Sequence, residues 1–334
     1  MTSGSTAAPP APPPDTPRAA TAPGGRTLQR ADARAGLALI SPTLIIVLVM
    51  VVLPILWTVV LAFQRLRLLN LRTSGLFGRW TLDNFASVFG SSSFWGSLAT
   101  TLAYSVLGTA FAIGVGLVAA LALRRPFRGR NFVRAAMLLP YVAPIVAVTF
   151  AWTTMLNPQF GVVNFWGTRL LGWDDPIAFL SQPSSTVSLF GLELSVPTAL
   201  LTVIAFEAWR SFPFAFLFLT ARLQAVPGTL EEAALMDGAT PLQRFRYVVL
   251  PQLLPTIAVL AVLRFIWTFN SFDDIYLLTG GGAGTEVISV SVFNALTARG
   301  DIGGAAAQAL VLAAILAVFV GLYLWKLAPR EDRS

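Results

Sequence analysis

Six long apolar stretches constrain the fold of this 334-residue sequence more than any other feature. They lie near residues 37–63, 98–123, 134–155, 197–220, 256–278 and 304–326. Each supplies about the 20 apolar residues that a helix needs to cross roughly 30 Å of hydrocarbon. Only 12% of the residues are charged, whereas soluble domains carry about 25%. The pattern predicts an all-α fold, a polytopic membrane bundle of six transmembrane helices.

The first 35 residues have a different composition. They are rich in Ala, Pro, Thr and Gly and contain no apolar run. Such a segment cannot bury enough surface to order itself. No apolar stretch of the signal-peptide kind follows a basic start. We therefore expect a disordered tail over 1–35 and one six-span domain over 36–334.

The distribution of Lys and Arg predicts the orientation. If the N-terminus is inside, the inside segments (1–36, 124–134, 221–255 and 326–334) hold 15 of the 23 Lys and Arg residues, and the outside segments hold 6. Basic residues concentrate on the cytoplasmic side of membrane proteins. Four of the six lie in the first outside segment, 64–97, which weakens the bias locally. The total predicts a multi-pass membrane protein with both termini in the cytoplasm.

Missing residue types exclude several kinds of chemistry. The chain has no Cys and no His, and Lys326 is its one Lys. It therefore lacks the Gly-Lys-Ser/Thr of a phosphate-binding loop. We expect no metal site, no cofactor and no catalytic role in this chain. The net charge of +7 is attributed to Arg residues beside the spans, so a nucleic-acid partner is not expected.

The most informative segment is the polar loop 226–255. Thr229 followed by Glu232 predicts a capping box at the start of a two-turn helix over 230–237. Gly238 suits the left-handed position after the last turn. Thr240 and Pro241 then start a second helix, which runs toward Leu250-Pro251. The pattern predicts a short helix-turn-helix that could dock another protein.

The same loop resembles the EAA signature of the permease subunits of ABC importers. The signature is Glu-Ala-Ala, three residues, Gly, nine residues, an aliphatic residue, one residue, and Leu-Pro. It occurs here as Glu232-Ala233-Ala234, Gly238, Val248 and Leu250-Pro251. The resemblance implies that the first helix seats in a cleft of a separate ATPase subunit. The coupling residues implied are Glu231, Glu232, Ala233, Ala234, Asp237 and Gly238.

Further segments resemble the sugar-importing branch of that family, and its first permease more than its second. They are residues 80–85, 139–144, 157–164 and 272–282. That branch usually has Pro after the glycines, where this chain has Ala283. The resemblance implies a heterodimer with a second permease, two ATPase subunits that hold ATP and Mg²⁺, and an extracytoplasmic sugar-binding protein.

Two spans carry polar and aromatic residues at helical spacing. Glu207, Arg210, Ser211 and Phe214 share one face of the fourth span. Arg264, Trp267, Thr268 and Ser271 repeat that spacing in the fifth. Ionisable residues within spans are functional candidates by default, and aromatic rings with hydrogen-bonding groups suit a polyol. The resemblance implies that these positions line the translocation cavity, apart from Arg210, which rests on its charge and spacing.

The sequence leaves alternatives open. Glu207 and Arg210 could form a purely internal ion pair, and Asp273 and Asp274 could lie at the outer interface. A permease for another solute, such as amino acids, peptides or an inorganic anion, fits the EAA signature equally well. A stand-alone secondary transporter could use Glu207 and Asp274 as ion sites, but it leaves the signature unused.

Overall fold

The computed structural model describes residues 38–71, 79–189 and 192–327. The chain divides into two units, Met1–Trp57 and Thr58–Ser334, and each is considered by itself. The tail expected over 1–35 lies outside the described residues. The described part of the first unit is helical from Ala38 and includes η1 (Leu48–Val52) and the start of α2 (Leu53–Ala62), whose last residues belong to the second unit.

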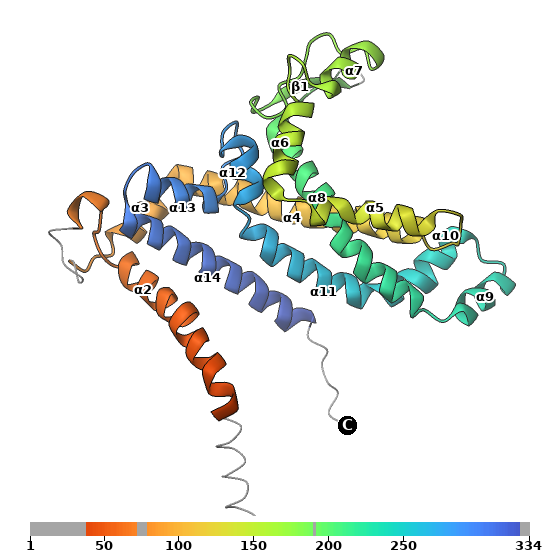
Figure 1. The fold of residues 1–334 in the computed structure, drawn as a ribbon, viewed down its shortest axis with the longest axis horizontal. Coiled ribbons are helices and arrows are strands. Elements are labelled where there is room, and N and C mark those ends of the chain that lie inside the picture. The colour runs from red at the N-terminus through yellow and green to blue at the C-terminus, as the bar shows by residue number, and fades with distance from the viewer. Residues whose placement is uncertain (1–37, 72–78, 190–191, 328–334) are drawn as a thin grey trace, which may run out of the picture. The chain divides into compact units, whose positions relative to one another are not determined.

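Within the described residues, five helices are long and apolar enough to cross a membrane, or six if one bent pair forms a single span. The five are Ala38–Ala62, α4 (Ser92–Ala122), α8 (Thr198–Gln224), the continuous helix Pro241–Phe269, and α14 (Ile302–Leu327). The helical membrane fold is confirmed. Figure 1 shows that these long helices dominate the molecule.

The third predicted span differs from the expectation of one kinked helix over 134–155. It consists of α5 (Arg130–Val142) and α6 (Ile145–Met155), whose axes differ by 97°. The break falls at Ala143-Pro144. A residue before Pro avoids the helical region, and Ala143 is extended, with φ −65° and ψ 142°. Pro140 and Pro213, by contrast, lie inside α5 and α8.

The fifth span begins earlier than expected. The second helix of the 226–255 loop does not end near Leu250-Pro251. Instead, α10 (Pro241–Arg244), η3 (Phe245–Val249) and α11 (Leu250–Phe269) form one uninterrupted helix. The π-helical turn η3 bonds the Leu250 amide to the Phe245 carbonyl. The fifth span therefore ends at Phe269, and residues 273–279 form a separate helix, α12 (Asp273–Thr279).

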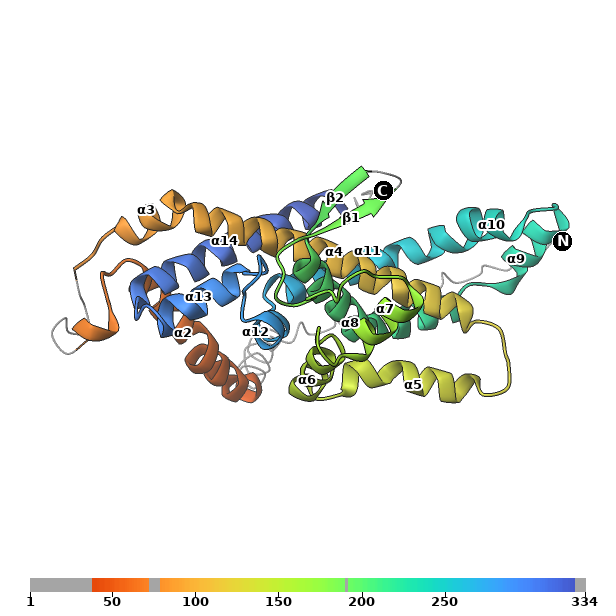
Figure 2. The same ribbon diagram turned by 90° about the horizontal axis from the view of Figure 1, so that it is seen from above.

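Short elements occupy the segments expected outside. They are η2 (Leu68–Asn70), α3 (Asp83–Gly90), α7 (Val162–Leu170), α13 (Ile288–Thr297) and a hairpin of β1 (Ser185–Leu189) and β2 (Leu192–Val196). The hairpin is antiparallel, with Ser185 opposite Val196. It is a small β element among described residues that are mostly helical, and Figure 2 shows it clearly.

The centre of the second unit is the packing of α4 against α8 and α11, which lie side by side in Figures 1 and 2. Buried apolar residues of these three helices, including Phe216, Leu219 and Leu253, form one core. Gly116 allows the close approach of α4 to α8. A Cβ atom there would lie 2.7 Å from the Ala215 Cβ. Small residues at such contacts are typical of membrane helices.

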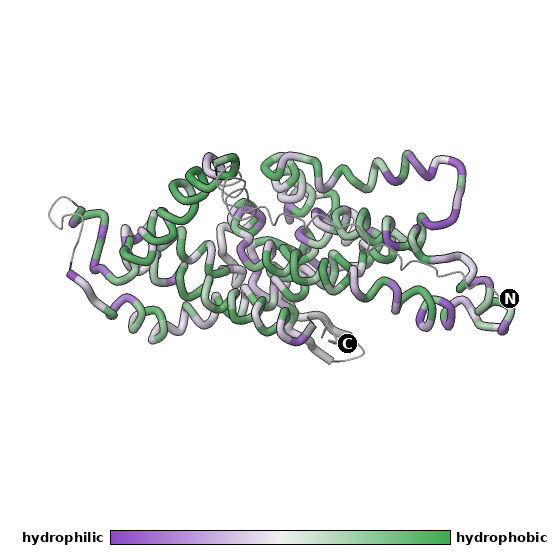
Figure 3. The backbone as a smooth tube through the Cα atoms, turned by 90° about the horizontal axis from the view of Figure 1, so that it is seen from below, coloured by the Kyte–Doolittle hydropathy of each residue, from purple (hydrophilic) through white to green (hydrophobic). Residues whose placement is uncertain are grey.

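Hydropathy varies along the backbone as the membrane prediction requires. In Figure 3 the long helices are mostly hydrophobic, and hydrophilic residues gather at their ends and in their connections. The polar connections thus lie at the two ends of the bundle. One end carries the 226–255 loop and the other carries the short elements α3 and α13.

Candidate functional site

The coupling helix predicted in the 226–255 loop is α9 (Gly228–Met236), one to two residues earlier than expected. It protrudes with α10 from the end of the bundle (Figure 1). Glu232 and Ala233 are exposed. Two apolar side chains at its C-terminal end, Leu235 and Met236, are exposed as well, Met236 by 86%. They add apolar surface to a polar end of the bundle.

The expected capping box of Thr229 and Glu232 is wrong. Pro227 occupies the N-cap position, with φ −61° and ψ 126°, and no side chain caps the helix. Because the helix already begins at Gly228, Thr229 lies inside the first turn, where its hydroxyl cannot reach the capping position. The sequence pattern matched a capping box, but the helix starts two residues too early for it, with Pro227 rather than Thr229 at the N-cap.

The end of α9 and the start of α10 agree with the sequence prediction. Gly238 has φ +78°, in the left-handed region, and its amide donates to the Leu235 carbonyl at 3.0 Å. Thr240 caps α10 in a full capping box with Gln243, and Pro241 follows at the first helical position. The turn between the two helices is therefore fixed by backbone geometry on one side and by a cap on the other.

An ion pair connects α9 to another part of the bundle. The Arg124 guanidinium, just after α4, contacts the Glu231 carboxylate on α9. Both side chains are partly shielded from solvent. Glu231 was expected to act toward the ATPase, but its carboxylate is engaged within the chain. Arg124 was assigned only a topological role by its position in the basic 124–134 segment.

A second cluster lies inside the spans, around Glu207. This side chain is 2% exposed, and its Oε1 atom accepts a hydrogen bond from the Arg264 guanidinium. The hydroxyls of Ser211 and Thr268 also donate to Oε1, each at 3.1 Å. Arg264 and Thr268 come from α11, so the charge pair joins α8 to α11. The main partner of Glu207 is therefore Arg264 rather than Arg210.

Arg210 turns toward a different carboxylate. Its Nη2 donates to Asp274 Oδ2 at 3.1 Å, its Nε lies 3.1 Å from Oδ1, and Glu207 Oε2 is 3.7 Å away. Tyr104 and Ser271 complete the surroundings of Asp274, with hydroxyl distances of 3.2 and 3.4 Å. Asp274 is fully buried, whereas Asp273 is exposed. The two adjacent carboxylates therefore have different surroundings.

Aromatic rings form a half-exposed group beside this polar cluster. The rings of Phe214 and Trp267 lie edge to face, with centroids 5.1 Å apart. Tyr141, from α5, lies 6.1 Å from Phe214. The Arg264 guanidinium approaches the Trp267 ring at 5.9 Å. Trp267 is 47% exposed, so the group presents ring surface outward while the charges lie behind it.

The eight residues expected along the pathway therefore separate into two neighbouring groups. Six belong to the polar cluster, and Phe214 and Trp267 belong to the aromatic group. The sequence analysis missed Tyr104 and Tyr141, which lie on other helices and show no pattern of their own. Close packing explains the burial: a Cβ atom on Gly108 of α4 would lie 3.2 Å from Glu207 Cγ. Within the described residues, no group of His, Cys, Asp and Glu is placed to hold a metal ion.

The described chain is a helical membrane domain with an exposed helix, α9, between its fourth and fifth spans, an arrangement that agrees with the permease subunits of ABC importers. Residues 112–330 match the family described as binding-protein-dependent transport system inner membrane component. The chain belongs to this family. It is an inner membrane permease component with several membrane-crossing helices.

Relatives match over nearly their whole length. The inner membrane ABC transporter permease protein YcjO of Escherichia coli (strain K12) is 34% identical over 86% of this chain and 92% of its own. The trehalose/maltose transport system permease protein MalF of Thermococcus litoralis is 32% identical, over 89% and 95%. A chain in the crystal structure of a bacterial ABC transporter that imports the acidic polysaccharide alginate superimposes with a TM-score of 0.75. The two chains are 25% identical, and the match covers 92% of this chain and 100% of the alginate importer chain.

Proposed function

We propose that this chain forms half of the translocation pathway of an ATP-driven importer for a sugar, which an extracytoplasmic binding protein delivers. Similarity to permeases named for sugar transport supports the substrate class. Besides MalF, the trehalose transport system permease protein SugA of Mycobacterium tuberculosis is 31% identical over 92% of this chain. The other half of the pathway would come from a second permease in a heterodimer.

The geometry of α9 is the observation that carries the coupling role. Its exposed face combines Glu232 and Ala233 with the apolar Leu235 and Met236. This face would seat in a cleft of the ATPase, and Asp237 and Gly238 would form the turn at its edge. Ala233 and Ala234 are small enough to permit close approach. Two ATPase subunits would hold the ATP and Mg²⁺, and this chain would contribute neither catalysis nor a cofactor site.

The aromatic group and the polar cluster have different roles in this proposal. Trp267 and Phe214 offer ring faces for stacking on a sugar. Arg210 is the most accessible of the buried charges, with its side chain 27% exposed, and could reach a hydroxyl from the same side. Glu207, Ser211, Arg264 and Thr268 bond to one another, so they would hold α8 and α11 in register behind the rings. Ser271 would orient Asp274 in the same way.

The orientation with both termini in the cytoplasm is part of the proposal. It places α9 on the side of the ATPase and places α3, α7, α13 and the hairpin outside. A reporter fused after Lys326 should lie in the cytoplasm, and one inserted near Ser185 should lie outside. Two reporters on the same side would disprove the orientation.

Uptake by the assembled complex tests the substrate class. The permease pair, the ATPase and the binding protein would be reconstituted in liposomes and offered labelled trehalose, maltose and other saccharides. Uptake of a saccharide that stops when the ATPase carries an inactivating substitution supports the proposal. sn-Glycerol-3-phosphate is included as a comparison solute, because a 35% identical relative is named for its transport. If it is taken up and no saccharide is, the substrate is a phosphorylated polyol rather than a sugar.

A further inference from the structure

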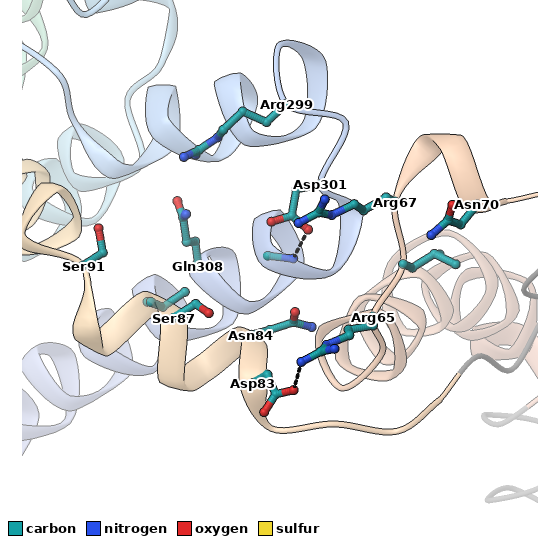
Figure 4. Close-up of a pocket in the computed structure, with 13 residues that line it drawn as sticks. Arg65, Arg67, Asn70, Asp83, Asn84, Ser87, Ser91, Arg299, Asp301 and Gln308 are labelled. Atoms are coloured by element: carbon teal, nitrogen blue, oxygen red, sulfur yellow. Dashed lines mark hydrogen bonds and ion pairs between the residues drawn. The ribbon is translucent and has the colours of Figure 1, made fainter.

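A polar cavity lies at the end of the second unit opposite α9. It has a volume of about 540 Å³. Its walls come from the segment after Ala62, from α3, and from the start of α14 (Figure 4). Its charged side chains are three Arg and two Asp: Arg65, Arg67, Arg299, Asp83 and Asp301. None of these residues belongs to α9 or to the polar cluster around Glu207.

The walls are built by specific backbone contacts. The Leu66 carbonyl accepts hydrogen bonds from the amides of Ile302 and Gly303, at 3.1 and 3.0 Å. The Asn84 side chain donates to the carbonyls of Ala62 and Gln64, at 2.8 and 2.9 Å. These bonds join three segments of the chain, and the first and the last of them are more than 200 residues apart in the sequence. The cavity is therefore a fixed feature of the fold rather than a gap between loops.

Some charged groups in the cavity have partners within the chain and others do not. Arg65 pairs with Asp83. Hydrogen bonding with Thr81 and the neighbouring Arg65 guanidinium lower the pKa of the Asp83 carboxyl, so it is ionised at neutral pH. Asp301 Oδ1 accepts from the Gly304 amide at 3.0 Å. In the described part of the chain, the guanidinium groups of Arg67 and Arg299 form neither a hydrogen bond nor an ion pair.

Two other features indicate what would complement the cavity. Gln308 Oε1 is buried and lacks a hydrogen-bond partner among the described residues, so the cavity also contains an acceptor that needs a donor. The described lining includes no aromatic ring, so sugar stacking of the kind offered by Trp267 is absent there. A protein loop with an acidic side chain supplies both a carboxylate for the guanidinium groups and backbone N–H donors.

We propose that this cavity receives an acidic side chain of the extracytoplasmic binding protein, held by Arg67 and Arg299. The proposal rests on the proposed function and its orientation, which place the cavity on the outer face. A carboxylate between two guanidinium groups forms charge-assisted hydrogen bonds, which are stronger than neutral ones. The pairing would fix how the binding protein sits over the pathway and would speed its association.

Charge reversal tests the proposal in the reconstituted complex. The variants are Arg67→Glu and Arg299→Glu, and the measurement is the binding-protein concentration that gives half-maximal ATPase activity. We expect an increase of roughly tenfold or more for each variant. The matched control is Arg79→Glu, an exposed Arg of the same outer segment that does not line the cavity, and we expect less than about a threefold change.

The remaining outcomes are also decisive. If a reversed charge prevents assembly, Arg299→Gln removes the charge with little change in size and should give a smaller shift in the same direction. Equal half-maximal concentrations in wild type, Arg67→Glu and Arg299→Glu would overturn the proposal while leaving the importer function intact. If the ATPase activity of the wild-type complex does not respond to the binding protein, both the cavity proposal and the proposed importer function are overturned. Weakened binding of free sugar, with normal response to the binding protein, would make the cavity a sugar site instead.

Discussion

The Arg124 guanidinium contacts the Glu231 carboxylate and so connects the end of α4 to α9, across 107 positions of the sequence. This ion pair gives α9 a contact with the α4–α8 core that does not pass through its own flanking turns. The remaining carboxylate of the helix, Glu232, is exposed and available to a partner.

The first prediction concerns this ion pair. Arg124→Glu places two carboxylates together and should lower sugar uptake per ATP hydrolysed severalfold, because α9 loses its fixed position. The double variant Arg124→Glu with Glu231→Arg should recover most of the loss. Partly exposed pairs contribute modestly to stability, so assembly should be unaffected. If the double variant is no better than the single ones, the pair does not position α9.

The second prediction concerns the buried charges. Glu207→Ala leaves Arg264 buried without its carboxylate, and breaking such a pair costs about 3–5 kcal/mol. The thermal unfolding temperature of the complex in detergent should fall markedly. The double variant Glu207→Gln with Arg264→Gln removes both charges and should be less damaging than Glu207→Ala. Equal damage would mean that the two side chains are not coupled.

The third prediction concerns the aromatic group. Trp267→Ala removes a stacking surface and should reduce sugar uptake severalfold without disturbing assembly. Aromatic contacts contribute about 0.5–1.5 kcal/mol beyond buried area, so abolition is not expected. Trp267→Phe keeps a ring and serves as the matched control. Unchanged uptake for Trp267→Ala and for Phe214→Ala would move the sugar to another part of the pathway.

Much of this architecture follows from local sequence patterns. Apolar length predicts the spans, the residue Gly238 predicts a left-handed turn, and Thr240 followed by Pro241 predicts a cap. These features depend on residues that are neighbours along the chain. Helical spacing also places Glu207 and Ser211 on one face, and the structure does bond them to each other.

Partners that are distant in sequence could not be predicted in the same way. Tyr104 and Asp274 are 170 positions apart, and only the packing of α4 beside α8 and α12 brings them together. The sequence pairs Glu207 with Arg210 because they are three residues apart, but Arg264 competes for the same carboxylate from α11. The polar cavity around Arg67 likewise joins segments from both ends of the domain.

The last prediction concerns the turn after α9, and the glycines at the two ends of this helix provide a matched pair. Gly228 begins α9 and Gly238 follows it, and a Cβ atom would meet nothing within 4 Å at either position. They differ in backbone conformation, because Gly238 alone has a positive φ, +78°. Gly238→Ala should therefore be strained by about 1 kcal/mol, whereas Gly228→Ala should be nearly neutral.

Gly238→Asp should be more damaging, because it adds a carboxylate beside Asp237 at the surface proposed to seat against the ATPase. We expect the variant to insert in the membrane and to pair with the second permease, since the spans are remote from this turn. ATPase capture in a pull-down should fall, and uptake should fall with it. Gly238→Asn tests the backbone alone, because Asn tolerates the left-handed conformation better than Ala, and it should retain more activity than Gly238→Ala. Normal ATPase capture and normal uptake by Gly238→Asp would show that α9 is not the coupling element.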